Sequence, residues 1–429
     1  MRRLRIADCG LRIGAAFVGN LAVCLLVSLS PCLPVSRASA AGPAGELIAP
    51  LETTHNHASC IVECPNGDIL ACWYRGSGER QADDVRIVGA RLRRGRGRWS
   101  PVFEMADTSG FPDCNPCMIV DGSRRLWMFW PVILDNHWES ALLKCRTSVD
   151  YEKPGPPKWE QDRTLLLKPG PEFAAAVHRD LMKQAQPYLD RAEGTTKAKL
   201  QTLLESILKK ADDKLATRLG WMPRAHPLLD GGRLLLPLYS DGFDFSLVAY
   251  TDDDGATWQT SEPMVGPGNV QPTLAKRKDG TLVAFYRDNG PPPQRVMQSE
   301  SKDGGRTWSL ARDIDVPNPG AGLEVLVLRS GRWLLVNNPT EHGRHALAIH
   351  VSEDEGRTWP TLRYLENDPP GSAAGSYSYP SILQARDGAI HVSYSYTPNR
   401  AAIAKEGRGE SIKHVRFTES ELLAGWPER

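Results

Sequence analysis

Six cysteines are the residues whose type and spacing first suggest chemistry. They all lie between residues 60 and 145, at Cys60, Cys64, Cys72, Cys114, Cys117 and Cys145. The pair Cys114 and Cys117 has the C-x-x-C spacing of zinc sites and of disulfide motifs. No histidine pair follows at zinc-finger spacing, so we expect no metal site here. Disulfides stay open for an exported chain, but small buried strand residues are the better interpretation for most of the six.

An octapeptide that occurs three times explains how such residues are positioned. It begins at Thr251, Ser301 and Ser352 and ends at Trp258, Trp308 and Trp359, with the pattern S/T-x-D-x-G-x-T-W. The copies lie about 50 residues apart, which is the spacing of a structural repeat. An Asp side chain can accept hydrogen bonds from nearby backbone N–H groups, and Gly supplies a positive φ. The repeat therefore predicts hairpin turns, each closed by a tryptophan packed into the sheet.

A second repeat consists of paired apolar strands joined by a glycine turn. It recurs six times, with glycines at Gly67, Gly122, Gly231, Gly280, Gly331 and Gly388. Worn copies of the octapeptide end at Trp99 and Trp159. Six units of about 50 residues, each a small antiparallel sheet, predict an all-β protein with a six-bladed β-propeller over residues 46–429.

A helical stretch interrupts the third unit. From residue 172 to 218 the apolar residues follow helical spacing, for example Leu200, Leu204 and Leu208. Gly194 separates two helical segments, and Pro187 is expected to kink or end the first. We therefore predict a helical hairpin inserted in the third blade, as a stabilising flap, a lid or a partner surface.

Composition and the N-terminus limit the possible partners. The chain of 429 residues has 52 Lys+Arg and 51 Asp+Glu, which removes the case for nucleic acid as a partner. Residues 1–40 resemble an export signal, with an arginine-rich start, an apolar stretch over 13–30 and Ala38-Ser39-Ala40 as the cleavage site. We expect an exported monomer, periplasmic or extracellular, without stable membrane insertion after cleavage.

The repeated octapeptides are similar to the Asp boxes (BNR repeats) of the sialidase, or neuraminidase, superfamily. The resemblance extends from about Thr53 to Tyr396 apart from the helical insertion. It implies a six-bladed propeller in which the Asp boxes are structural. It also implies a site on the inner strands with three arginines for the substrate carboxylate, a Tyr nucleophile, an assisting Glu and an acid/base Asp.

Three residues match this family pattern. Tyr379, in a Tyr-Pro-Ser-Ile-Leu segment before Asp387-Gly388, falls at the nucleophile position, with Tyr377 and Tyr394 as alternatives. Arg287 and Arg344 fall at the positions of two carboxylate-binding arginines. Arginine suits that role because its planar fork holds a carboxylate through two hydrogen bonds.

Other positions depart from the family or are less sharply placed. Gln271 stands where the family has Glu, so it can position a hydroxyl but cannot take its proton. His57 stands at the first arginine's position, and Arg224 is expected to compensate for the missing charge. Asp84 is our candidate acid/base, with Asp83 and Glu79 as alternatives, all in or just after a glycine-rich loop.

Short amides complete the expected site. Asn115 and Asn318 lie at the inner edges of the second and fifth units, where they suit sugar hydroxyls, although both are also ordinary turn formers. Of the 12 tryptophans, those that end the octapeptides are expected to be architectural. Trp73 and Trp130 are the expected stacking platforms for a sugar.

The resemblance implies an exported exo-glycosidase acting on a glycan with a carboxylated sugar, sialic acid by default, through a retaining mechanism without metal or organic cofactor. Two alternatives remain open. His57 and Gln271 also suit a hydrolase or lyase of a uronate polysaccharide, and a propeller that binds carbohydrate without turnover is the third possibility.

Overall fold

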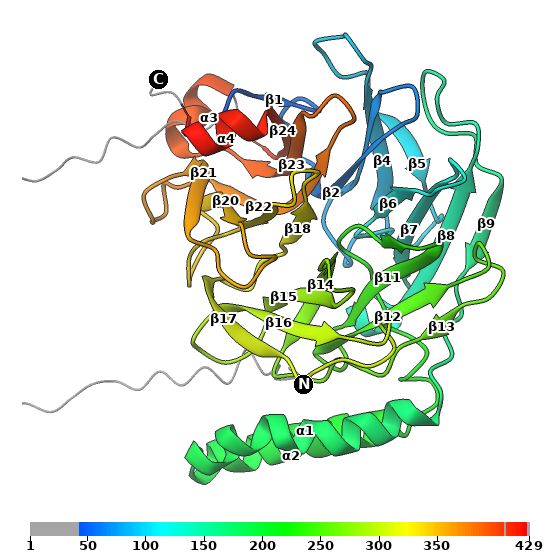
Figure 1. Ribbon diagram of the computed structural model, residues 1–429, viewed down its shortest axis with the longest axis vertical. Coiled ribbons are helices and arrows are strands. Elements are labelled where there is room, and N and C mark those ends of the chain that lie inside the picture. Colours follow the sequence, from blue (N-terminus) through cyan, green and yellow to red (C-terminus); the bar gives the residue numbers. More distant parts are fainter. Residues whose placement is uncertain (1–42, 407–408, 427–429) are drawn as a thin grey trace, which may run out of the picture.

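Six four-stranded antiparallel sheets form a ring, which is a six-bladed β-propeller (Figure 1). The computed structural model describes residues 43–406 and 409–426, so the predicted export signal lies outside the described residues. The first strands of neighbouring sheets contact one another around the centre of the ring. The fold predicted from the two repeats is confirmed.

Each of the first three blades follows the chain from the centre outward. The first blade contains β2 (His55–Glu63), β3 (Ile69–Gly76), β4 (Arg86–Leu92) and β5 (Phe103–Ala106). The second contains β6 (Cys117–Val120), β7 (Leu126–Ile133), β8 (Ala141–Ser148) and β9 (Gln161–Thr164), with the short 3-10 helix η2 (Trp138–Ser140) before β8. The third contains β10 (Leu228–Asp230), β11 (Arg233–Ser240), β12 (Phe245–Thr251) and β13 (Gln259–Thr260).

The remaining blades repeat this order until the last one. The fourth contains β14 (Asn269–Lys276), β15 (Leu282–Asp288), β16 (Arg295–Ser301) and β17 (Arg312–Pro317). The fifth contains β18 (Glu324–Val327), β19 (Trp333–Asn337), β20 (Ala346–Ser352) and β21 (Thr361–Asn367). The sixth contains β22 (Ser376–Gln384), β23 (Ile390–Thr397), β24 (Ser411–Phe417) and β1 (Gly45–Leu47).

The last blade closes the ring with a strand from the start of the chain. Strand β1 pairs antiparallel with β24, with Gly45 opposite Val415. Two short helices, α3 (Arg400–Glu406) and α4 (Glu419–Ala424), flank β24 along the chain. Thr418 and Glu421 form a capping box that starts α4.

The predicted helical insertion is a pair of helices beside the ring (Figure 1). Helix α1 (Pro171–Arg191) and helix α2 (Gly194–Ala211) follow β9 and precede β10, so they lie between the second and third blades along the chain. Phe173 of α1 is buried against Trp221 and Phe243. Pro187 does not end α1, which continues to Arg191 and buries Leu189 beyond the proline.

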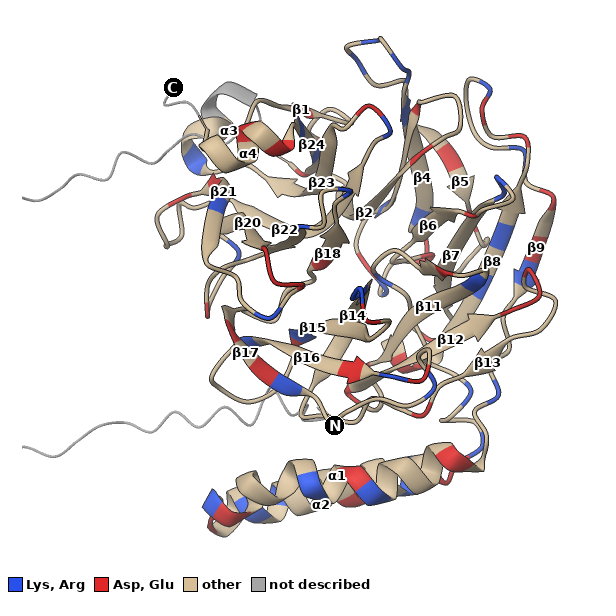
Figure 2. Cartoon of the chain, viewed as in Figure 1, with Lys and Arg blue, Asp and Glu red and all other residues tan. Residues whose placement is uncertain are grey.

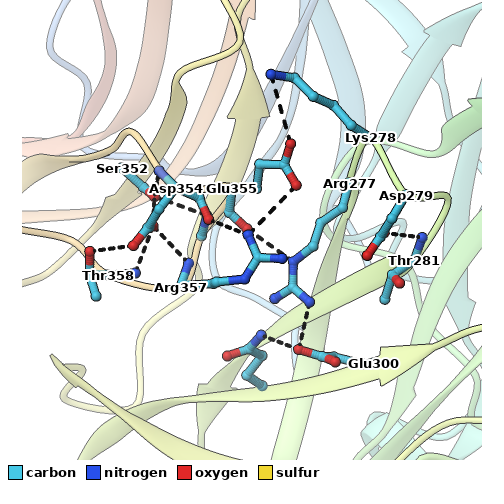
Figure 3. A network of polar contacts seen from close by, with 12 residues as sticks. Arg277, Lys278, Asp279, Thr281, Glu300, Ser352, Asp354, Glu355, Arg357 and Thr358 are labelled. Carbon is cyan, nitrogen blue, oxygen red and sulfur yellow. Dashed lines mark hydrogen bonds and ion pairs between the residues drawn. The ribbon is translucent and has the colours of Figure 1, made fainter.

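The octapeptides form the expected turns, and the third one shows how (Figure 3). The carboxylate of Asp354 accepts hydrogen bonds from the Ser352 hydroxyl at 2.7 Å and from the Thr358 N–H at 2.9 Å. Gly356 has φ 78°, and a Cβ there would lie 2.8 Å from the Trp333 ring, so only glycine fits.

The tryptophans of these turns join neighbouring blades. Trp359 packs edge-on against Phe285 of the fourth blade at 5.6 Å, and Trp258 packs likewise against Phe129 of the second at 5.8 Å. Arginines make the same connection with backbone groups: Arg277 donates to the Glu355 carbonyl at 3.2 Å (Figure 3) and Arg233 to the Gly304 carbonyl at 3.0 Å. The octapeptide is therefore both a turn and a contact between blades.

We predict that Asp354→Ala lowers the free energy of unfolding by about 1–2 kcal/mol, because it removes the acceptor for several turn donors at once. Glu353→Ala, one residue away, removes only an exposed ion pair with Arg332 and is the matched control with an effect below about 1 kcal/mol. Urea unfolding of both variants tests this, and equal losses would contradict it.

Candidate active site

A polar cavity of about 290 Å³ opens at the centre of the ring. Its lining residues come from the loops and strand ends at one end of the sheets, and they are His57, Tyr74, Glu79, Arg80, Asn115, Trp138, Tyr239, Asp241, Gln271, Arg287, Asn289, Arg344 and Tyr379. Two larger cavities lie beside the β4–β5 turn, at the other end of the sheets. The small central cavity is the candidate site because charged and titratable groups converge there.

Backbone irregularities on the inner strands aim several side chains into this cavity. Gln271 and Tyr379 have φ of 54° and 55°, and each precedes a proline. The strand register shifts at both positions, as it does after His57, where Ala58 has φ 55°. Asn115, also followed by proline, has φ 40°. Positive φ values at non-glycine residues are costly and mark functional positions when they recur in this way.

Tyr379 lies at the middle of the site. Its hydroxyl oxygen accepts hydrogen bonds from Arg287 Nη1 at 2.9 Å and from Gln271 Nε2 at 3.2 Å. The guanidinium carbon of Arg344 lies 5.3 Å from the centre of its ring. Burial opposes ionisation of the phenol, but Arg287 and Arg344 outweigh it and hold the pKa of Tyr379 below its ordinary value. The Tyr379 phenol is therefore easier to ionise than an ordinary tyrosine.

Tyr239 and Asn115 continue the hydrogen bonds that begin at Tyr379. The Tyr239 hydroxyl oxygen accepts from Asn115 Nδ2 at 3.1 Å and from Gln271 Nε2 at 3.3 Å. Burial raises the pKa of Tyr239 well above its ordinary value, so this phenol stays neutral. The Gln271 Oε1 atom is buried without a hydrogen-bond partner.

The three arginines of the expected carboxylate site occupy different places. Arg287 and Arg344 line the cavity. Arg224 is buried behind Tyr379, with its guanidinium carbon 5.1 Å from the ring centre. It donates to the Pro380 carbonyl at 2.9 Å and to the Ser59 carbonyl at 3.3 Å. Arg224 therefore supports the floor of the cavity and does not reach a substrate carboxylate.

His57 lies against the other side of Tyr379. The two ring centres are 4.3 Å apart, and His57 also packs edge-on against Tyr74 at 5.6 Å. Burial holds the pKa of His57 well below its ordinary value, so its imidazole is neutral. It therefore does not replace the positive charge of an arginine.

The acid/base candidate differs from the first expectation. Asp84 is exposed, does not line the cavity, and accepts hydrogen bonds from the N–H and hydroxyl groups of Ser77. Glu79, the alternative in the same loop, does line the cavity. It accepts a hydrogen bond from the Tyr74 hydroxyl at 2.9 Å and lies 3.5 Å from His55 Nε2. The Asp84 carboxylate closes the loop by accepting from Ser77, and Glu79 within that loop faces the cavity.

A charged pair below the cavity connects four blades. His226 Nδ1 lies 2.7 Å from Glu324 Oε1, and His226 Nε2 lies 2.7 Å from the Ile61 carbonyl oxygen. Because both oxygens can only accept, both nitrogens carry protons and His226 is an imidazolium. Burial opposes this charge, but Cys60 and Glu324 raise the pKa of His226 well above its ordinary value. The other oxygen of Glu324 accepts from the Ile382 N–H at 2.9 Å.

Part of the chain is similar in sequence to known proteins. A BNR repeat-like domain matches residues 216–392. A sialidase from Micromonospora viridifaciens is 26% identical over 155 residues, which is 34% of this chain and 23% of that protein. The chain thus matches less than a quarter of the length of this curated relative.

Solved structures extend the similarity to the whole ring. The Hadza microbial sialidase Hz136 superposes with a TM-score of 0.61 at 15% identity, covering 88% of this chain and 68% of that one. The NanB sialidase from Streptococcus pneumoniae gives 0.62 at 11% identity, covering 88% and 71%. The chain is a six-bladed propeller that contains a BNR repeat-like domain, and it is distantly similar to sialidases. A Dyadobacter fermentans protein of unknown function superposes at 0.63 and 15% identity, covering 90% and 99%.

Several residues of the candidate site were not foreseen from the sequence. Tyr239, Trp138 and Arg80 line the cavity, and Trp138 stacks with Arg80 at 5.2 Å. Tyr239 stands near the end of β11 much as Arg287 stands near the end of β15, so the repeat could have indicated it. Trp138 lies in a short 3-10 turn without any repeat signal.

The expected sugar platforms are wrong. Trp73 and Trp130 are fully buried, and their indole N–H groups donate to Asn56 at 2.8 Å and Asp113 at 2.6 Å. Both side chains point into the blades because strand residues alternate between faces. Of the aromatic residues on strands, the cavity presents Tyr74, Tyr239 and Tyr379 instead.

The cysteines lie in the interior of the described part of the chain. The six cysteines from Cys60 to Cys145 are free thiols and all buried. No group of His, Cys, Asp and Glu side chains in the described part of the chain is arranged to hold a metal ion. Over the same residues, no helix is both long and apolar enough to cross a membrane.

The pH dependence of stability provides a test of the charges beside the cavity. Burial would lower the pKa of His55, but its hydrogen bond to Glu410, at 2.6 Å, and its ion pair with Glu79, at 3.5 Å, raise it to about 9. A raised pKa means that His55 stabilises the fold below about pH 6.5, its unfolded pKa, and that this contribution is lost as the pH rises through 9.

We therefore predict that the free energy of unfolding falls between pH 6.5 and pH 9.5 in the wild type by more than in His55→Asn. The control is His342→Asn, which removes an exposed histidine and should leave the wild-type slope unchanged. Urea unfolding across this pH range measures the slopes. Parallel slopes for wild type and His55→Asn would overturn the assignment of charge to His55.

Proposed function

We propose that the chain is an exo-acting glycosidase that hydrolyses the bond to a carboxylated terminal sugar. The observation that supports this most is the phenol of Tyr379, which accepts from Arg287 and lies beneath Arg344. A nucleophile held between two cations suits a substrate whose anomeric carbon carries a carboxylate. The similarity to sialidases makes sialic acid the first sugar to test.

In this proposal Tyr379 attacks the anomeric carbon as a phenolate and forms a covalent glycosyl intermediate, which water then hydrolyses with overall retention. Arg344 binds the substrate carboxylate. Arg287 and the amide of Gln271 hold the phenolate in place by donating to its oxygen. Gln271 cannot remove the phenol proton, so ionisation of Tyr379 depends on the nearby arginines.

Glu79 is the proposed group for proton transfer at the leaving oxygen and for activating water. Burial would raise the pKa of Glu79, but His55 and the Tyr74 hydroxyl lower it to about 2, so the side chain is ionised at neutral pH. The proton for the leaving group is then held on His55, whose Nε2 lies 3.5 Å from the Glu79 carboxylate. Glu79 would pass this proton on during bond cleavage.

The ionised state of Glu79 also favours a second candidate, a lyase for uronate-containing polysaccharides. In that reaction an arginine neutralises the uronate carboxylate and the Tyr379 phenolate removes the proton beside it. The glycosidic C–O bond at the neighbouring carbon then breaks, and the leaving oxygen takes the proton from the Tyr379 phenol, so no carboxylic acid is needed at the start. The product would carry a carbon–carbon double bond, which hydrolysis does not create.

An assay of the mature chain against a fluorogenic sialoside and a panel of uronate glycosides and polysaccharides distinguishes these reactions. Release of the fluorophore supports the glycosidase, and ultraviolet absorption from an unsaturated uronate supports the lyase. Binding without turnover of any of them would favour a propeller that only binds glycans.

We predict that Tyr379→Phe reduces turnover by at least about a thousandfold while ligand binding remains within about tenfold of wild type, because the nucleophile or base is lost but the arginines stay. Tyr377→Phe is the matched control: it lies in the same strand, but its hydroxyl binds Asp368 at 2.7 Å and does not line the cavity. Sialoside turnover that survives Tyr379→Phe would rule out the proposed role.

We predict that Arg344→Gln weakens binding of a carboxylated sugar about tenfold to a hundredfold, since a charge-assisted hydrogen bond is lost. It should also raise the pKa of Tyr379, so the rising limb of kcat/KM against pH moves to higher pH. Steady-state kinetics across pH test both effects. A binding loss without movement of the limb would separate carboxylate binding from control of the phenol.

A further inference from the structure

Four arginines crowd the turn that joins β4 to β5. Arg93, Arg94, Arg96 and Arg98 alternate with glycines and are all exposed. Among the described residues no ion pair joins any of these four guanidinium groups to a carboxylate, whereas the neighbouring Arg91 is buried 3.6 Å from Asp68. Figure 2 shows basic residues gathered at the tip of this turn.

The arginine side chains are not needed to form the turn. Its backbone closes through the Arg96 N–H, which donates to the Arg93 carbonyl at 2.9 Å, and through the Arg94 N–H, which donates to Asp68 at 2.9 Å. Gly95 supplies the positive φ of 73°. In the third, fourth and fifth blades the same position is occupied by the octapeptide, whose side chains hold the turn. The arginine sequence therefore requires another explanation.

Two cavities flank this turn. One of about 1000 Å³ lies between the turn and the sixth blade, where Arg386 and Arg416 line it. The other, of about 1120 Å³, lies toward Pro101 and Val102. The acidic residues of the first cavity already have partners: Glu63 lies 3.2 Å from Arg386, Asp387 lies 3.1 Å from Arg416, and Glu46 accepts from Trp99 at 3.1 Å. The excess positive charge thus belongs to the turn.

We propose that the β4–β5 turn, residues 93–98, and the clefts on either side of it bind a polyanionic glycan, a chain bearing repeated carboxylate or sulfate groups. Guanidinium groups bind such anions through paired hydrogen bonds. A lipid surface is a poor fit because the tip contains only arginine and glycine and has no apolar side chain to insert. Nucleic acid is a poor fit because 52 cationic and 51 acidic residues leave no broad basic face.

The position of this turn separates it from the candidate active site. Strand β2 begins at the end of the sheet where His57 lies. Strand β3 runs back to this same end, and Glu79 lies in the loop that follows β3. Strand β4 runs away again, so residues 93–98 lie at the opposite end of the first blade. A glycan anchored there leaves the cavity around Tyr379 open and raises the local concentration of neighbouring chains. The anchor goes beyond the proposed glycosidase and does not depend on its chemistry.

The test is binding of two polyanions, polygalacturonate and dextran sulfate, with neutral dextran as the uncharged probe. The variant combines Arg93→Gln, Arg94→Gln, Arg96→Gln and Arg98→Gln. The matched control removes four exposed charges of the helical hairpin and the turn after it, through Lys197→Gln, Lys199→Gln, Lys209→Gln and Lys214→Gln. Affinity electrophoresis at low and high salt measures retention, and thermal unfolding checks that each variant is folded.

We expect wild type, the lysine variant and Tyr379→Phe to bind both polyanions, with affinity falling as salt increases, and the arginine variant to bind about tenfold more weakly. Wild-type affinity from the arginine variant, or an equal loss in the lysine variant, would overturn the proposal. Tighter binding of wild type to duplex DNA or to anionic vesicles than to either glycan would also overturn it.

Discussion

The buried ion pair between His226 and Glu324 is the interaction on which the centre of this propeller depends. His226 donates to the backbone of β2, and Glu324 of β18 accepts from the backbone of β22. The pair therefore holds β2 and β22 at a fixed distance from β18. Arg224, two residues before His226, fixes the carbonyls of Ser59 and Pro380 in the same strands. These are the strands whose irregular backbone aims His57 and Tyr379. Breaking a buried pair by removing one partner leaves an uncompensated charge, which costs about 3–5 kcal/mol.

Much of the fold could be predicted because its turns depend on short local residue patterns. An Asp, a Gly and a Trp at constant spacing specify a hairpin and a contact with the next blade, and counting them specifies the ring. The helical hairpin was visible as a change in hydrophobic period. Strand β1 could not be foreseen, because three residues without an alternating pattern become a strand only through pairing with β24.

Part of the candidate site could likewise be predicted from the sequence, and part could not. Gln271 and Tyr379 lie on inner strands, Arg287 near the end of β15 and Arg344 in the loop before β20. The resemblance to sialidases indicated all four, and the cavity brings them together. The choice between Asp84 and Glu79 depended on how one loop folds, which spacing alone does not encode. Arg224 was expected to supply positive charge to the substrate site, but its guanidinium group donates to backbone carbonyls instead. The prediction that Trp73 and Trp130 stack against a sugar was wrong, because a position on a strand does not show which face of the sheet is buried.

The closure of the last blade affects the order in which the propeller can fold during synthesis. The sheet that contains Tyr379 is completed by Gly45–Leu47, so its outermost strand is synthesised first and its other strands last. Until the final strands emerge, β1 has no partner and the inner strands cannot surround the cavity. Contacts between such distant parts of a chain form slowly, because a long loop must close before they are made. The ring around Tyr379 therefore closes only after β24 has paired with β1.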